Sequence, residues 1–87
     1  MNKALIKFPC KFTIKVMGVN LPNFIAEIAD IVVKHCEDFD PNNDIRTNIS
    51  KQGNYLSLSI TIQVLSQQHL DKIYQELNAN SLVKFVL

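Results

Sequence analysis

Apolar and polar residues alternate most regularly from Tyr55 to Val64. One side of this segment is wholly aliphatic: Leu56, Leu58, Ile60, Ile62 and Val64. The other side carries polar or hydroxyl groups: Tyr55, Ser57, Ser59, Thr61 and Gln63. A period of two predicts a strand with one buried face. Gln52-Gly53-Asn54 tolerates positive φ, so Ile45–Ser50 is predicted to fold back as the antiparallel partner of this strand.

A shorter alternation from Phe12 to Met17 predicts a first strand, which Gly18 ends. Asn20 is a favourable N-cap, and Pro22 fits the first turn of a helix because its missing N–H is not needed there. A helix is therefore predicted from this point to about Cys36. Its apolar residues recur at three- and four-residue steps: Leu21, Phe24, Ile28, Ile31, Val32 and His35.

The last third of the chain predicts one more helix and one more strand. Ser66 is a second N-cap, and the helix behind it has an apolar stripe of Leu70, Ile73, Tyr74 and Leu77. Asn78–Asn80 closes that helix. Ser81–Leu87 is predicted to be a strand with two apolar-rich sides, namely Val83, Phe85 and Leu87 against Leu82, Lys84 and Val86.

The resulting order, β-α-β-β-α-β, predicts an α+β fold. Each helix has one apolar stripe, so two layers suffice to bury the core. With right-handed crossovers this gives a two-layer ferredoxin-like sandwich: a four-stranded antiparallel sheet in the order 4-1-3-2, with both helices on one face. We expect residues 1–11 to form an N-terminal arm and residues 12–87 to form a single domain.

The composition is that of an ordinary small globule, with 87 residues, 47% hydrophobic and 20% charged. The chain has no apolar run long enough to span a bilayer, and its first residues lack the features of a signal peptide, so a cytoplasmic location is expected. Cys10 and Cys36 are expected to be reduced thiols. Lysines dominate the start of the chain and acids its middle, which predicts a basic and an acidic side if these parts fold apart.

Two features of the sequence offer candidate chemistry. The acidic run from Asp38 to Asp44 starts like a calcium loop, but it lacks the glycine and the final glutamate of such a loop, so a solvated turn is expected. His35 and His69 have no nucleophile and orienting acid near them in sequence, and Cys36 points about 100° away from His35 on a helix. We therefore predict no catalytic residue, no metal site and no cofactor.

Three segments together carry a family resemblance: Phe12-Thr13-Ile14-Lys15-Val16-Met17-Gly18, the helix start at Leu21-Pro22, and Ser50 to Thr61. With the closing Val83–Leu87 they closely resemble the YbeD-like family of small bacterial proteins, over nearly the whole chain from Phe8. That family looks like the ACT-type regulatory domains of amino-acid-metabolising enzymes. The resemblance implies a cytoplasmic bacterial protein with no established biochemical activity.

The resemblance also implies a candidate ligand loop. ACT-type domains typically bind a small amino acid where the first strand meets the first helix, often at a subunit interface. The matching positions are Met17, Gly18, Val19, Asn20, Leu21 and Pro22. This loop has no acidic residue to meet a ligand ammonium group.

The polar face of the sheet is a second candidate surface, for binding a partner. Its residues are predicted to be Lys15, Arg46, Asn48, Ser50, Tyr55, Ser57 and Lys84. Leu82, Val86 and Met17 are also expected there, which suggests a face covered by the arm or by another subunit.

The hypothesis from sequence is a non-enzymatic ACT-like regulatory or adaptor domain. It would bind a protein partner or a small metabolite, with a homodimer through edge strands as one version. The alternative is a weak single-stranded RNA-binding module using Lys15, Arg46, Tyr55 and Lys84 on the open sheet face, although the RNP1 pattern is absent.

Overall fold

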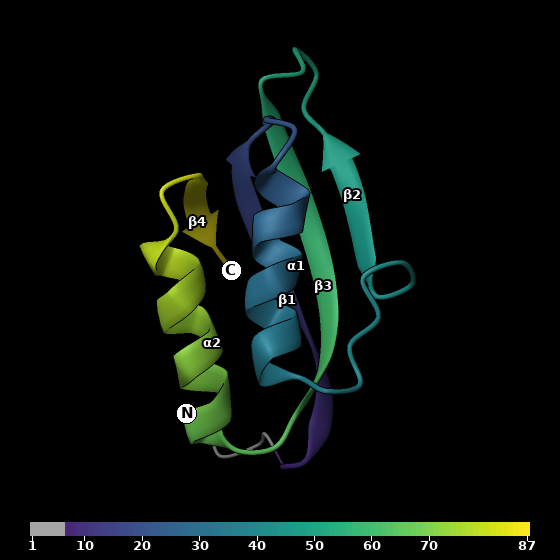
Figure 1. The fold of residues 1–87 in the computed structure, drawn as a ribbon, viewed down its shortest axis with the longest axis vertical. Coiled ribbons are helices and arrows are strands. Elements are labelled where there is room, and N and C mark those ends of the chain that lie inside the picture. The colour runs from purple at the N-terminus through teal and green to yellow at the C-terminus, as the bar shows by residue number, and fades with distance from the viewer. Residues whose placement is uncertain (1–6) are drawn as a thin grey trace.

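A computed structural model describes residues 7–87 and shows a four-stranded sheet with two helices. The elements are β1 (Cys10–Val19), α1 (Phe24–His35), β2 (Ile45–Ile49), β3 (Tyr55–Val64), α2 (Gln67–Ala79) and β4 (Val83–Val86). The strands lie in the order β2-β3-β1-β4, and every neighbouring pair is antiparallel. Both helices cover the same face of the sheet (Figure 1). The predicted ferredoxin-like fold and its strand order are confirmed.

The core lies between that face and the helices. As the alternation predicts, Leu56, Leu58 and Ile60 of β3 are buried, and the polar residues between them are not. From the helices the buried side chains include Phe24, Ile28 and Val32 of α1 and Leu70, Ile73 and Leu77 of α2. Sheet and helices thus bury one common apolar layer, and within residues 7–87 no helix covers the other face of the sheet.

Strand β1 is longer at both ends than predicted. It runs from Cys10, opposite Val64, to Val19, opposite Tyr55. Gly18 therefore does not end the strand. A Cβ at this position would lie 2.4 Å from Cζ of Phe24, so the glycine lets the helix pack against the strand. The last two residues of the predicted arm belong to the sheet, and residues 1–6 lie outside the described part.

Helix α1 begins later than the predicted start at Asn20–Pro22. Its first residue is Phe24, with Asn23 as the N-cap and no side-chain capping hydrogen bond. Asn20 instead donates its side-chain amide to the carbonyl of Gly53 (2.9 Å) and its backbone N–H to the carbonyl of Asn54 (3.1 Å). The residue that resembled a helix cap thus ties the β1–α1 loop to the β2–β3 hairpin.

Helix α2 agrees with its prediction. The hydroxyl of Ser66 accepts a hydrogen bond from the backbone N–H of His69 (3.1 Å), which is the expected N-cap contact. The helix ends at Ala79, with Asn80 as its C-cap.

Strand β4 contradicts the predicted sides of its residues. Val86 pairs with Val16 and Phe85 pairs with Met17, but Val83 pairs with Gly18, so the register shifts by one residue at this point. Such a bulge places two residues opposite one and reverses the alternation beyond it. Val83 and Val86 pack against the core, as does Leu82, while Phe85 is 45% exposed. The expectation that Val86 and Leu82 lie on the polar face is therefore wrong.

Candidate functional site

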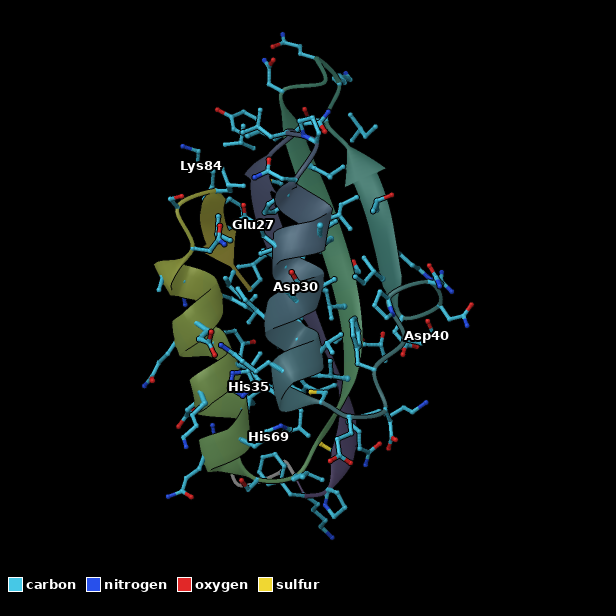
Figure 2. The ribbon with its side chains drawn as sticks, viewed as in Figure 1. Glu27, Asp30, His35, Asp40, His69 and Lys84 are labelled. Carbon is cyan, nitrogen blue, oxygen red and sulfur yellow. The ribbon has the colours of Figure 1, made fainter. Side chains whose placement is uncertain are left out.

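The face of the sheet that faces away from the helices carries a strong bias of charge. All eight acidic residues of the chain lie in α1, in α2 or in the segment between α1 and β2. The strands contain the cations Lys11, Lys15, Arg46 and Lys84 and no acid. In Figure 2, Glu27 and Asp30 lie on α1, Asp40 lies in the segment between α1 and β2, and Lys84 lies at β4. The expected separation of a basic from an acidic side follows from the strand and helix positions.

An apolar cluster lies on this same face. It consists of Met17, Val19, Tyr55, Phe85 and Leu87. Residues directly opposite each other in an antiparallel pair share a face, and Met17 pairs with Phe85 and Val19 with Tyr55. Leu87 exchanges both backbone hydrogen bonds with Lys15 (2.8 and 3.2 Å) and so lies beside it on this face.

The cluster is open to solvent. Tyr55 is 43% exposed, Phe85 45% and Leu87 67%, and Met17 and Val19 are half-buried between them. Three large exposed apolar residues on one small sheet face differ from singly scattered surface residues, which need no explanation. Lys15 pairs with Leu87, Lys84 precedes Phe85 in sequence, and both lysines are exposed.

Most residues of the predicted partner-binding face lie on one side of the sheet, as the strand pairing requires. Arg46 pairs with Ser59 and Asn48 with Ser57, so these side chains share the face of Lys15 and Tyr55. Ser50 differs because its hydroxyl accepts a hydrogen bond from the N–H of Tyr55 (3.1 Å) and closes the hairpin. Lys84 lies at the bulge. Whether these residues bind a partner stays a prediction.

The predicted ligand loop, Met17–Pro22, has few free donors. The N–H of Val19 donates to the carbonyl of Leu82 (3.0 Å), and that of Leu21 donates to the carbonyl of Val19 (2.8 Å). Asn20 is bonded to the hairpin as described, Pro22 has no N–H, and the space beside Gly18 is filled by Phe24. Amino-acid binding at this loop stays a prediction, and it would require the loop to open.

A hollow of about 650 Å³ lies at the other end of the molecule, where α1 and β3 end and α2 begins. His35, Cys36 and His69 line it, together with Lys11 and Asp44. Figure 2 shows His35 and His69 at this end, far from Lys84. Sγ of Cys36 lies 3.9 Å from Nε2 of His69, a proximity that the sequence did not suggest.

The hydrogen bonds of His69 show that Cys36 and His69 do not form a nucleophile–base pair. Its Nδ1 accepts from the N–H of Leu65 (3.1 Å), so Nδ1 carries no proton, and Nε2 is the protonated nitrogen that donates to the carbonyl of His35 (2.7 Å). A histidine whose two nitrogens are occupied in this way cannot take a proton from Cys36. Burial also raises the pKa of the Cys36 thiol, which keeps it protonated and unreactive.

A polar contact beside the hollow joins the two helices. Glu76 of α2 accepts from Lys34 (2.6 Å) and contacts His35 (2.5 Å), both at the end of α1. These two hydrogen bonds, from Lys34 first, lower the pKa of Glu76. Because Glu76 and Lys34 are well exposed, the contact contributes little to stability. It links the last turn of α1 to α2.

The acidic run is a hydrogen-bonded turn. Asp40 accepts from the N–H of Asn42 (3.0 Å) and from the side chain of Asn43 (2.6 Å), while its own N–H donates to Asp44 (2.9 Å). Across residues 7–87, no three histidine, cysteine or acidic side chains are grouped so that they could hold a metal ion. In the same range no helix is long and apolar enough to cross a membrane.

The sequence pattern of a family described as "Protein of unknown function (DUF493)" matches residues 3–87 of this chain. A relative from Paraburkholderia phymatum, described as "UPF0250 protein", is 39% identical over 87 residues. That alignment covers 100% of this chain and 97% of the relative.

Two solved structures are similar in fold. The solution structure of protein HP0495 from H. pylori has a TM-score of 0.74 at 16% identity, covering 98% of this chain and 88% of that one. The ACT domain from the GTP pyrophosphokinase of Chlorobium tepidum has a TM-score of 0.63 at 17% identity, covering 88% and 94%. At these identities the similarity shows the fold alone.

Proposed function

This chain belongs to the DUF493 family of proteins of unknown function, the YbeD-like family that its sequence resembles, and on that premise we propose that it is a non-enzymatic adaptor domain of the bacterial cytoplasm that binds a protein partner through its open sheet face. The observation that carries the proposal is the apolar cluster. An exposed apolar group framed by charged residues is typical of a protein-binding surface. Tyrosine, phenylalanine and methionine are residue types that such surfaces favour.

The charge of the face indicates which kind of partner fits. Lys11, Lys15 and Arg46 share the face with the apolar cluster, and the strands hold no acid to balance them. Two copies meeting face to face would bring these cations together, which is unfavourable. A partner segment with acidic residues around an apolar anchor is complementary to this face.

Affinity capture with matched variants tests the proposal. Phe85→Ser removes an aromatic group of the cluster, and Leu65→Ser removes an apolar residue that follows the end of β3 and is even more exposed (63%, against 45% for Phe85). We expect proteins that wild type and Leu65→Ser retrieve to be absent with Phe85→Ser. Retrieval of the same proteins by all three baits contradicts the proposal.

One observation favours a second candidate, a weak single-stranded RNA-binding module. The bulge in β4 places Phe85 on the open face, so two exposed aromatic residues, Tyr55 and Phe85, are available there for stacking. They lie on either side of β1, roughly 10 Å apart across the strands. A titration with oligouridine in low salt that shifts neither the Tyr55 nor the Phe85 resonances rules this candidate out.

A further inference from the structure

Strand β2 forms one edge of the described sheet, and only its β3 side is paired (Figure 1). The N–H of Ser50 donates to the carbonyl of Tyr55 and that of Thr61 to the carbonyl of Asp44 (both 3.0 Å). In an antiparallel ladder such bonded pairs recur at every second residue. Positions 44, 46, 48 and 50 therefore direct their backbone groups toward β3. Ile45, Thr47 and Ile49 direct theirs away from the sheet.

We propose that β2 pairs with β2 of a second copy, antiparallel and with the two-fold axis at Thr47. The strand reads Ile-Arg-Thr-Asn-Ile, which is nearly symmetric about its centre. On this axis each isoleucine faces the other isoleucine of the second copy, Arg46 faces Asn48, and Thr47 faces itself. The three residues with outward backbone groups become the hydrogen-bonded pairs, and no like charges lie opposite each other.

The charges beyond the strand also fit this register. Extending the pairing places Lys51 of the second copy opposite Asn43 and beside Asp44. Asp44 and Asp40 form the acidic turn that precedes β2, and Lys51 is exposed in the hairpin turn that follows it. An acidic turn therefore meets a lysine at each end of the paired strands, which favours this register over shifted ones.

The helix side of the edge is apolar. Ile49 is 60% exposed although it shares the side of the buried Leu56, because no helix covers β2 there. Ile25, Ala29 and Val33 recur every four residues along one flank of α1, and Ile25 is 39% exposed. The opposite flank of α1 contacts α2, so this stripe faces β2. Pairing places Ile45 of the second copy against Ile49 and reduces the exposed apolar surface.

The opposite edge of the sheet is less suitable. Natural proteins protect free edges with short strands, lysines and bulges. Strand β4 has four residues, a lysine and an irregular register, whereas β2 has no proline, bulge or lysine within Ile45–Ile49. The β2-paired dimer leaves both open faces free and carries the two apolar clusters toward its far ends, so it presents two binding surfaces.

Sedimentation and amide exchange test the pairing. A single strand pair buries less than about 1,000 Å², so we expect a dissociation constant on the order of 100 µM. Sedimentation from about 10 µM to about 1 mM should show a monomer–dimer equilibrium. Over the same range, NMR exchange of the Ile45, Thr47 and Ile49 amides should slow, because only these three gain acceptors. The amides of Arg46 and Asn48 should stay equally protected at both concentrations.

Two variants and one control accompany the measurement. Thr47→Pro removes an N–H that points away from β3, so the monomer should fold while the dimer weakens by about tenfold or more. Thr47→Lys places two ammonium groups at the two-fold axis, so it should also weaken the dimer, and it tests the pairing if the proline variant does not fold. Thr13→Lys makes the same charge change on the exposed face of β1 and should dimerise like wild type.

A monomer at about 1 mM overturns the proposal, as does a dimer whose Ile45, Thr47 and Ile49 amides remain unprotected. A dimer that both Thr47 variants leave intact overturns it too. These results are independent of partner capture, because the capture variant Phe85→Ser lies at the other edge of the sheet and leaves β2 unchanged.

Discussion

Gly18→Ala should destabilise the fold although the change adds one methyl group. A Cβ at this position would lie 2.4 Å from Cζ of Phe24 and 2.5 Å from the carbonyl oxygen of Leu82. The ring of Phe24 is fully buried, and the Leu82 carbonyl is held by the N–H of Val19. Neither neighbour can yield without moving α1 or the β4 entry relative to β1.

The magnitude follows from that clash. Non-bonded carbon atoms are ordinarily at least about 3.5 Å apart, so the added methyl group would overlap its neighbours by about 1 Å. Overpacking of this kind costs about 1–3 kcal/mol, and the stiffer unfolded chain returns about 0.4–1 kcal/mol. A net loss of about 1–2 kcal/mol lowers the Tm of a domain of this size by about 5–15 °C.

Gly53→Ala is the matched control. Gly53 has φ +78° and nothing within 4 Å of the added Cβ, so only the left-handed backbone opposes the change. That strain costs about 1 kcal/mol. Thermal and urea unfolding followed by circular dichroism should rank wild type above Gly53→Ala and Gly53→Ala above Gly18→Ala. A Gly18→Ala protein within about 0.5 kcal/mol of wild type refutes the packing argument.

Three further outcomes are expected. His69→Ala removes the acceptor of the Leu65 N–H and the donor to the His35 carbonyl, so urea unfolding should show a free energy of unfolding lower by about 1–3 kcal/mol. An unchanged unfolding midpoint contradicts the bonded role of this histidine. The folded-state pKa of Glu76 is lowered by its lysine and histidine partners on α1. The stability that Glu76 contributes is therefore present above its ordinary pKa of 4.5 and is lost as the pH falls through the lowered value. Glu76→Gln should show a smaller loss of Tm on acidification than wild type, and an equal loss contradicts this. The buried Cys36, whose pKa is raised, should be alkylated by iodoacetamide more slowly than Cys10 in a peptide-resolved mass measurement, and equal rates contradict the assigned burial.

The architecture could be predicted from the sequence where one periodicity dominates. The ten-residue alternation of β3 determined which side is buried, and the stripe of α2 did the same for that helix. Local signals were less reliable where a tertiary contact overrides them. Asn20 has the chemistry of a helix cap, but its side-chain amide donates a hydrogen bond to the carbonyl of Gly53 in the hairpin. The helix starts at Phe24 instead.

The candidate site depended on a feature that no local pattern encodes. The sides of β4 follow from a bulge opposite Gly18, which is a property of the pairing between two strands distant in sequence. Alternation alone placed Phe85 in the core and Val86 outside, so the apolar cluster was missed. The contacts of Cys36 with His69 and of His35 with Glu76 also join residues more than thirty positions apart.

The central claim is that the apolar cluster on the helix-free face is where a partner binds. Methyl NMR of Met17, Val19 and Leu87 during titration with a captured partner tests it most directly, with Val33 and Leu65 as reporters outside the cluster. We expect shifts at the three cluster residues and none at the two reporters. Shifts confined to Val33 or Leu65, with the cluster methyls unmoved, would contradict it.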